Sequence, residues 1–216
     1  MIHFHSPITM QIVKEDDITL TKNTFRLLIS GVTGSGKTTF VNNFLNIHHK
    51  KFHNLFCYAE NEDFKQFNVK FMPTSFNPLE DYLEGNSLVI FDDAIFNKTL
   101  VKIASELFIR GRHKKISVIF ITQNLFHQST GFRALSLNAS HVFIFAIRDL
   151  KQISYFAKSF LPDDEVKEFL KLYKKQVLEK PFHYLLIDFS QPCHSILRIR
   201  SNVLLEFEKY QSVHVL

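Results

Sequence analysis

One window near the start of the chain has residue types and spacing suited to binding phosphate. Half of the chain's six glycines lie within residues 31–38, which read GVTGSGKT. This G-x-x-x-x-G-K-[ST] spacing predicts a loop whose backbone N–H groups surround phosphate oxygens, with the positive end of a helix dipole aimed at them. Lys37 is expected to reach the β- and γ-phosphates of a nucleotide, and the Thr38 hydroxyl to hold Mg²⁺. The window therefore predicts a nucleoside triphosphate site.

Two adjacent carboxylates follow an apolar run further along the chain. Residues 87–91 read SLVIF, which suits a buried strand of a parallel sheet, and Asp92 and Asp93 come directly after them. Asp92 would hold Mg²⁺ through water, because this ion dehydrates reluctantly. Asp93 would orient and deprotonate an attacking water. The alternative is an ordinary turn, since Asp pairs often end strands.

A polar side chain also ends the next expected strand. Residues 116–121 read ISVIFI, and Gln123 follows shortly after them. Ligands of α/β proteins bind at the carboxyl ends of parallel strands, where Gln123 could contact the γ-phosphate or its attacking water. Its alternative role is that of an ordinary polar group at a strand end.

The basic run RGRHKK at residues 110–115 has two interpretations. Basic residues at a helix C-terminus complement the helix dipole. Alternatively, one arginine is delivered to the γ-phosphate of a neighbouring subunit, a device that accelerates other phosphohydrolases by about 10³–10⁵-fold. Arg112 is the first candidate for this role, Arg110 the second and Arg148 the third.

Residues 124–133, which read NLFHQSTGFR, combine aromatic side chains, amides and one glycine in an expected loop. Three roles remain open for this segment. It could contact a nucleic acid backbone at the centre of a ring, cap the nucleotide, or pack at a subunit interface.

The order of the remaining elements predicts an α/β fold of the P-loop NTPase type, RecA/ASCE-like. Because helices separate the strands, βαβ units and a mostly parallel sheet between two helix layers are expected. Residues 1–23 are expected to form an N-terminal extension with an edge strand near residues 9–13, and residues 24–216 the P-loop domain. Strands are expected at residues 25–30, 55–59, 69–71, 87–91, 116–121, 141–146, 184–187 and 195–199, and helices from the loop to residue 48 and at 97–110, 149–159 and 163–176.

Composition narrows the class without selecting a function. The net charge of +5 and the pI of about 9.1 permit a polyanionic partner, although metabolic enzymes reach such values too. No apolar run is long enough to cross a bilayer and the first residues are no signal peptide, so we expect a soluble protein with no membrane partner. Cys57 and Cys193 are isolated, which suits a reducing compartment, and the scattered histidines match no metal pattern.

Together these segments resemble the HerA–FtsK superfamily of genome-packaging ATPases. The resemblance is carried by GVTGSGKTT, by LVIFDD and above all by GRHKKISVIFITQNLFHQ, and it is closest to the ATPases of Polinton/Maverick-like elements and related double-stranded DNA viruses. The later stretches IFAIRDLKQISYFAK and KPFHYLLIDFSQ extend it over residues 24–200. The two Walker motifs are generic to P-loop ATPases, whereas SVIFITQNLF is the specific part.

The resemblance implies ATP hydrolysis that drives double-stranded DNA into a preformed capsid. It further implies a homo-oligomeric ring of five or six subunits, a capsid or portal protein as partner, and a viral assembly site in the host cell or the virion as location. Asp92 and Asp93 would serve Mg²⁺ and water activation, Gln123 would be the sensor, and Arg110 or Arg112 the arginine acting in trans. The implied ATP- and Mg²⁺-binding residues are Gly31, Val32, Thr33, Gly34, Ser35, Gly36, Lys37, Thr38 and Thr39.

Two departures from the family pattern accompany this resemblance. Asp93 stands where many relatives have Glu, so its reach to water is shorter, and residues 1–23 match no part of the pattern. Three other functions remain as alternatives: a P-loop kinase with a small acceptor, a regulatory GTPase, and a scaffold that binds ATP only to oligomerise. The adjacent acids favour hydrolysis over a kinase, and residues 97–100, NKTL, lack the acid of a guanine-reading N-K-x-D motif.

Overall fold

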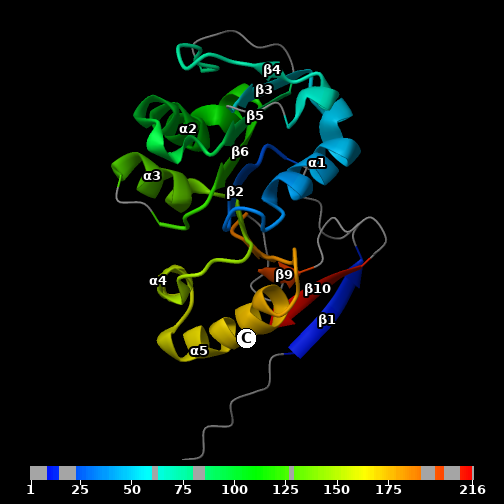
Figure 1. The fold of residues 1–216 in the computed structure, drawn as a ribbon, viewed down its shortest axis with the longest axis vertical. Helices are drawn as coiled ribbons and strands as arrows, with labels where there is room; N and C mark the ends of the chain where they lie inside the picture. Colours follow the sequence, from blue (N-terminus) through cyan, green and yellow to red (C-terminus); the bar gives the residue numbers. More distant parts are fainter. Residues whose placement is uncertain are drawn as a thin grey trace, which may run out of the picture.

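A ten-stranded sheet forms the centre of the computed structural model, with helices on both faces (Figure 1). The structure describes residues 9–14, 23–59, 63–79, 86–126, 129–190, 198–201 and 210–215. The strand order is β1-β10-β9-β8-β7-β2-β6-β5-β3-β4. The strands are β1 (Thr9–Lys14), β2 (Arg26–Ser30), β3 (Asn54–Tyr58), β4 (Lys70–Phe71), β5 (Ser87–Asp92), β6 (Ile116–Thr122), β7 (His141–Ile144), β8 (Leu185–Asp188), β9 (Ile199–Ser201) and β10 (Tyr210–Val215).

The sheet has a parallel part and an antiparallel part. The six strands from β7 to β4 in this order pair in parallel, whereas β8, β9, β10 and β1 continue the sheet with antiparallel pairs. The expected mostly parallel sheet is confirmed. β1 pairs with β10 at one end of the sheet, so the expected edge strand near residues 9–13 is confirmed as well. The N- and C-terminal strands thus lie side by side, as the blue and red arrows of Figure 1 show.

Helices cover the two faces of the sheet, as a three-layer sandwich requires. They are α1 (Lys37–His48), α2 (Lys98–Arg110), α3 (Thr130–Asn138), α4 (Leu150–Lys158) and α5 (Asp163–Tyr173), with short helical turns η2 (His49–Lys51), η3 (Lys65–Phe67), η4 (Ala94–Phe96), η5 (Gly111–Lys114) and the π-helical turn η6 (Lys174–Leu178). Successive strand residues point to opposite faces. In β2, Leu27 and Ile29 pack with the apolar face of α1, while Leu28 packs on the side of α2 to α5.

One helix lies where the sequence predicted a loop. α3 occupies Thr130–Asn138, so the prediction of a loop over residues 124–133 is wrong for its last four residues. The Ser129 hydroxyl caps this helix by accepting a hydrogen bond from the backbone N–H of Phe132 at 3.2 Å. Gly131, which suggested a loop, allows α3 to pack closely on α2, because a Cβ there would lie 2.9 Å from Cγ1 of Val101.

Some sequence-based expectations fall on residues outside the described ranges. These include residues 127–128 of the expected loop, Cys193, and most of the strand expected at residues 195–199, of which residue 199 begins β9. In the part of the chain that the structure describes, no helix has the length and apolar character needed to cross a membrane.

Candidate nucleotide site

Strand register brings the three predicted motifs to one edge of the sheet. β6 lies between β2 and β5, pairing Ser30 with Thr122 and Ile121 with Asp92. All three strands run parallel, so the residues that follow them emerge at the same carboxyl edge. The phosphate-binding loop, the acidic pair and Gln123 are therefore neighbours, although up to about ninety positions separate them in the sequence.

The phosphate-binding loop connects β2 to α1 and is fixed at both ends. The N–H of Gly31 donates to the carbonyl of Thr122 at 3.2 Å, and the N–H of Val32 to that of Ala146 at 2.8 Å. Gly34 and Gly36 have φ angles of 77° and 101°, which favour glycine. Gly36 precedes the first residue of α1, so the loop leads directly into a helix N-terminus, which attracts anions.

Lys37 lies between the phosphate-binding loop and the two carboxylates. Its ammonium donates to the carbonyl oxygens of Gly31 at 2.7 Å and Val32 at 2.9 Å, which uses two of its three N–H donors. Burial lowers the pKa of Lys37 because it disfavours the charged form, whereas the charges of Asp92 and Asp93 act in the opposite direction. The two carboxylates are thus close enough to stabilise the Lys37 cation.

The acidic pair and Gln123 form a connected group. Asp92 is the last residue of β5 and is half-buried, while Asp93 is exposed with a φ of 51°, in the left-handed region. The N–H of Asp93 donates to the carbonyl of Ile121 at 3.2 Å. The Gln123 amide donates from Nε2 to Oδ2 of Asp93 at 3.0 Å. A carboxylate oriented by an amide in this way is suited to position and deprotonate a water molecule.

The donor set at this edge fits Mg²⁺. Thr38 lies in the first turn of α1 and Asp92 at the end of β5, and both present hard oxygen ligands. Mg²⁺ is usually held by one or two protein oxygens together with substrate phosphates and water. The half-buried positions of Thr38 and Asp92, with Lys37 next to the carboxylates, suit such a shared arrangement.

The candidate arginines lie at different edges of the sheet. Arg110 ends α2 and Arg112 lies in η5, directly before β6 begins, and both are exposed. The charge of Arg112 lowers the pKa of Arg26, the first residue of β2, after the larger effect of burial. Arg110 and Arg112 therefore lie at the amino edge, away from the nucleotide site of their own chain. Arg148 is exposed and follows β7 at the carboxyl edge, where Ala146 contacts the loop.

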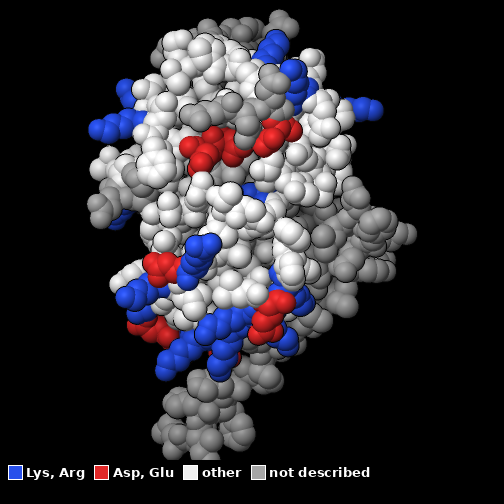
Figure 2. Space-filling model, viewed as in Figure 1, with Lys and Arg blue, Asp and Glu red and all other residues white. Residues whose placement is uncertain are grey.

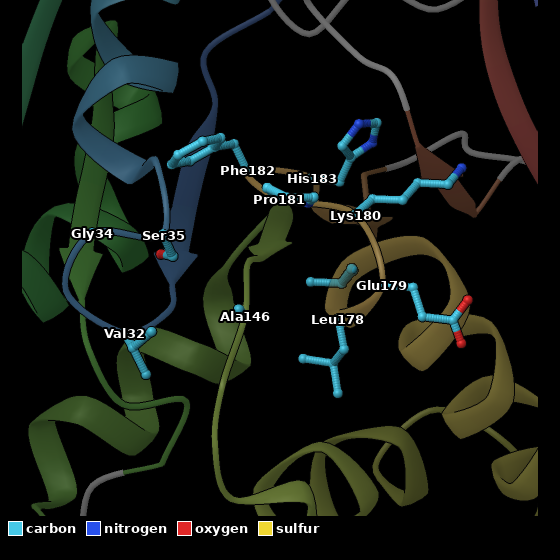
Figure 3. A pocket seen from close by; sticks show the side chains of 11 residues that line it. Val32, Gly34, Ser35, Ala146, Leu178, Glu179, Lys180, Pro181, Phe182 and His183 are labelled. Atoms are coloured by element: carbon cyan, nitrogen blue, oxygen red, sulfur yellow. The ribbon is translucent and has the colours of Figure 1, made fainter.

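A pocket beside the loop contains residues that the sequence did not predict. Its walls come from Val32, Gly34 and Ser35 on one side and from residues 177–183 on the other (Figure 3). Within the second wall, Phe182 is 71% exposed and has a φ of 61°. Its only sequence signal was its membership of the stretch KPFHYLLIDFSQ, because an exposed aromatic in a turn has no motif of its own.

Comparisons with known proteins match one segment of the sequence and most of the fold. The poxvirus A32 protein family matches residues 13–72, which include the phosphate-binding loop. No curated protein matches the sequence.

Solved structures match over most of the chain. The genome packaging NTPase B204 of Sulfolobus turreted icosahedral virus 2, in complex with AMPPCP, has a TM-score of 0.57 at 15% identity and covers 77% of this chain and 93% of its own. The DNA-packaging ATPase B204 of Sulfolobus turreted icosahedral virus has a TM-score of 0.57 at 14% identity, and the match covers 81% of this chain and 100% of that protein's chain. The pCW3 conjugation coupling protein TcpA, with ATPγS, has a TM-score of 0.53 at 14% identity, and the match covers 82% of this chain and 62% of that protein's chain. This chain therefore has the P-loop ATPase fold of these proteins, and the resemblance to viral genome-packaging ATPases that its motifs indicate is confirmed.

Proposed function

We propose that this protein is an ATP-driven motor that moves double-stranded DNA into a viral capsid. The observation that carries the proposal is the meeting of Lys37, Asp92, Asp93 and Gln123 at one sheet edge, next to a phosphate-binding loop. The match to the poxvirus A32 family and the fold shared with packaging NTPases support packaging over other uses of ATP. B204 has been solved with AMPPCP, with ATPγS and with AMP, which supports ATP as the ligand here.

The hydrolysis step follows from the roles of these side chains. The loop N–H groups and Lys37 hold the β- and γ-phosphates and neutralise their charge. Asp93, oriented by Gln123, accepts a proton from water as the water oxygen attacks the γ-phosphorus. The bond from the γ-phosphorus to the bridging oxygen breaks, which releases ADP and phosphate. Thr38 and Asp92 would hold Mg²⁺, which stabilises negative charge on the phosphate oxygens when bound.

A ring of identical subunits fits the position of the arginines. Arg110 and Arg112 lie at the opposite edge from the nucleotide site of their own chain, so either would serve a neighbouring subunit. Arg148 would instead serve its own site, because it follows β7 at the carboxyl edge. DNA would pass through the ring, and a capsid or portal protein at a viral assembly site would receive it.

The surface charge is compatible with a DNA partner without selecting one face. Figure 2 shows Lys and Arg gathered over the lower part of the molecule, where α4 and α5 lie, with acidic residues among them. α5 itself begins with Asp163, Asp164 and Glu165 and carries lysines further along. The excess of five positive charges thus arises from a mixed surface, so DNA contact depends on which side chains the ring turns inward.

Turnover of ATP by variants tests the site and the DNA partner together. Lys37→Ala should lose nucleotide binding, because the cation that faces the phosphates is removed. Asp93→Asn should still bind ATP but turn it over about 10²–10⁴-fold more slowly, because the general base is lost. Turnover by the unaltered protein should rise when duplex DNA is added. Steady-state phosphate release measures turnover, and isothermal titration with ATP measures binding by the two variants.

Asp163→Asn is the matched control, since Asp163 is an exposed carboxylate on α5 with 89% of its side chain accessible. It should leave turnover unchanged. Full activity of both Lys37→Ala and Asp93→Asn would refute the site. ATP binding without turnover, with or without DNA, would favour the scaffold that binds ATP only to oligomerise. Phosphate transfer to a nucleoside or nucleotide would favour a kinase.

A further inference from the structure

The pocket beside the phosphate-binding loop has a second wall, residues 177–183, that takes no part in the hydrolysis step. Its volume is about 320 Å³, at the small end of the range that holds small organic ligands. Val32, Gly34 and Ser35 of the loop form one wall, so any occupant lies directly next to the bound phosphates. In Figure 3, Leu178 and Glu179 belong to the opposite wall, and the ring of Phe182 extends from the turn towards the start of α1.

The second wall exposes apolar side chains that a core would bury. Leu178 is 44% exposed and Phe182 is 71% exposed, while Val177 beside them is buried. Grouped apolar side chains at a concave surface are typical of ligand sites, whereas single exposed ones carry no such meaning.

The conformation of Phe182 is unusual for an aromatic residue. Its φ of 61° lies in the left-handed region, which glycine and asparagine adopt far more readily. Strained backbone of this kind persists where the surroundings enforce it, and it is concentrated at ligand sites.

Both flanks of the turn hold Phe182 in this position. On one side, η6 is a π-helical turn in which the N–H of Glu179 donates to the carbonyl of Lys174 at 3.0 Å. On the other side, Tyr184 is buried, with ring centroids 5.1 Å from Phe40 and 4.9 Å from Phe145. The turn is thus anchored in the core beneath α1, and the ring of Phe182 is left exposed outside the core.

The ring also lies against the phosphate-binding loop. A Cβ at Gly36 would lie 3.4 Å from Cδ1 of Phe182, which is ordinary van der Waals contact, and Gly36 is the residue that precedes α1. An aromatic face at this distance from the loop is within reach of a base joined to the phosphates by one ribose.

We propose that this pocket binds the purine base of the nucleotide, with Phe182 as the aromatic surface on which the base stacks. Every base has a face that can stack on an aromatic ring. Val32 and Leu178 would shield the edges of the base from water. The inference rests on the proposed binding of a triphosphate by the loop, because the phosphates determine where the base can lie.

A tryptophan at position 182 would report stacking directly. The chain contains no tryptophan, so Phe182→Trp introduces a single indole whose fluorescence is unambiguous. ATP should quench this fluorescence, whereas magnesium tripolyphosphate should displace ATP without quenching. Leu137→Trp is the control, because Leu137 is 73% exposed near the end of α3, before β7 begins at the opposite edge of the sheet. Its emission should respond to neither ligand.

Truncation of the ring gives a second measurement. Phe182→Ala should weaken ATP binding about 5- to 100-fold and leave tripolyphosphate binding unchanged, as loss of one base–aromatic stack predicts. Phe182→Tyr should retain ATP affinity. Phe182→Gly removes the ring and also relieves the positive φ, so it should fold well and still lose ATP affinity, which separates the ring from backbone strain.

The outcomes separate this inference from the proposed function. Equal weakening of ATP and tripolyphosphate by Phe182→Ala, or an indole at position 182 that ATP does not quench, would overturn the base site while leaving the phosphate site intact. Failure of the unaltered protein to bind either ligand would overturn the proposed function and the base site with it.

Discussion

The hydrogen bond between Gln123 and Asp93 joins the ends of two neighbouring strands. The amide of Gln123 donates at 3.0 Å, and Asp93 sits in a left-handed backbone conformation that turns its carboxylate away from the strand direction. Aspartate tolerates this conformation better than most residues. The carboxylate is thus held by a partner side chain, which makes Gln123 a positioning residue for Asp93.

Removing the Gln123 amide should show whether it orients Asp93 without contributing to ATP binding. Gln123→Ala should lower kcat by about 10- to 1000-fold, the range for loss of one preorganised donor, and leave ATP affinity unchanged. Gln66→Ala is a matched control, because Gln66 is an amide in an exposed contact with Asn42. Isothermal titration and phosphate release would measure affinity and kcat, and an unchanged kcat would show that Asp93 is oriented without Gln123.

The antiparallel part of the sheet depends on buried polar contacts between elements. Arg200 of β9 is fully buried and pairs with Asp188 of β8, while His141 of β7 lies 3.4 Å from the same carboxylate. His214 of β10 is buried against the Ser201 hydroxyl at 2.9 Å. Buried charges need partners of this kind, so β8, β9 and β10 are tied to the parallel strands by polar groups as well as by backbone pairing.

Two histidines, His214 of β10 and His48 of α1, should make the fold sensitive to acid. Burial, followed by the charges of Lys180 and Lys175, lowers the pKa of His214 from 6.5 to about 4, and burial followed by Lys51 does the same for His48 at the end of α1. The folded state therefore disfavours the protonated forms that the unfolded chain takes up below its own pKa of 6.5. Stability from these groups is complete above that value and falls as the pH approaches 4.

Urea unfolding at about pH 7.5 and about pH 5 measures this loss. His48→Gln and His214→Gln together should reduce the dependence on pH, because neither glutamine can take up a proton. His141 should retain its share, since burial lowers the pKa of His141 as well. A slope that the double variant does not change would assign the acid sensitivity to other groups.

At the scale of the whole molecule, the nucleotide site and the preferred arginines occupy opposite edges of the parallel sheet. Asp93 follows β5 at the carboxyl edge, whereas Arg110 and Arg112 precede β6 at the amino edge. The sheet separates them, so one chain cannot bring Arg112 to its own phosphates without refolding. A ring that places the amino edge of one subunit against the carboxyl edge of the next would complete each site.

Mixing of inactive subunits tests this arrangement. Arg112→Ala and Asp93→Asn should each be inactive alone, and their mixture should regain part of the activity, because an intact Asp93 then meets an intact Arg112 from its neighbour. Lys37→Ala mixed with Asp93→Asn is the control and should remain inactive, since both residues act within one chain. A mixture of Arg110→Ala with Asp93→Asn tests Arg110, the second candidate for the arginine that acts in trans. Absence of rescue with either arginine would point to Arg148, which lies at the carboxyl edge of its own chain.

The sequence by itself determined the local parts of this protein. Residues 31–38 specify the loop, because the positive φ angles at Gly34 and Gly36 and the lysine at the helix start are properties of neighbouring residues. The apolar runs before Asp92 and Gln123 likewise indicated buried parallel strands with polar ends, and those strands are present.

Only the tertiary structure decided how these parts meet. Placing β6 between β2 and β5 brings Gln123 to Asp93, and the same topology sends Arg112 to the far edge. α3 depends on the close approach that Gly131 allows to α2, and the position of Phe182 depends on Tyr184 being buried beneath α1. Each of these contacts joins residues far apart in the chain. Strand pairing and side-chain packing stabilise them, and the spacing of nearby residues does not predict either.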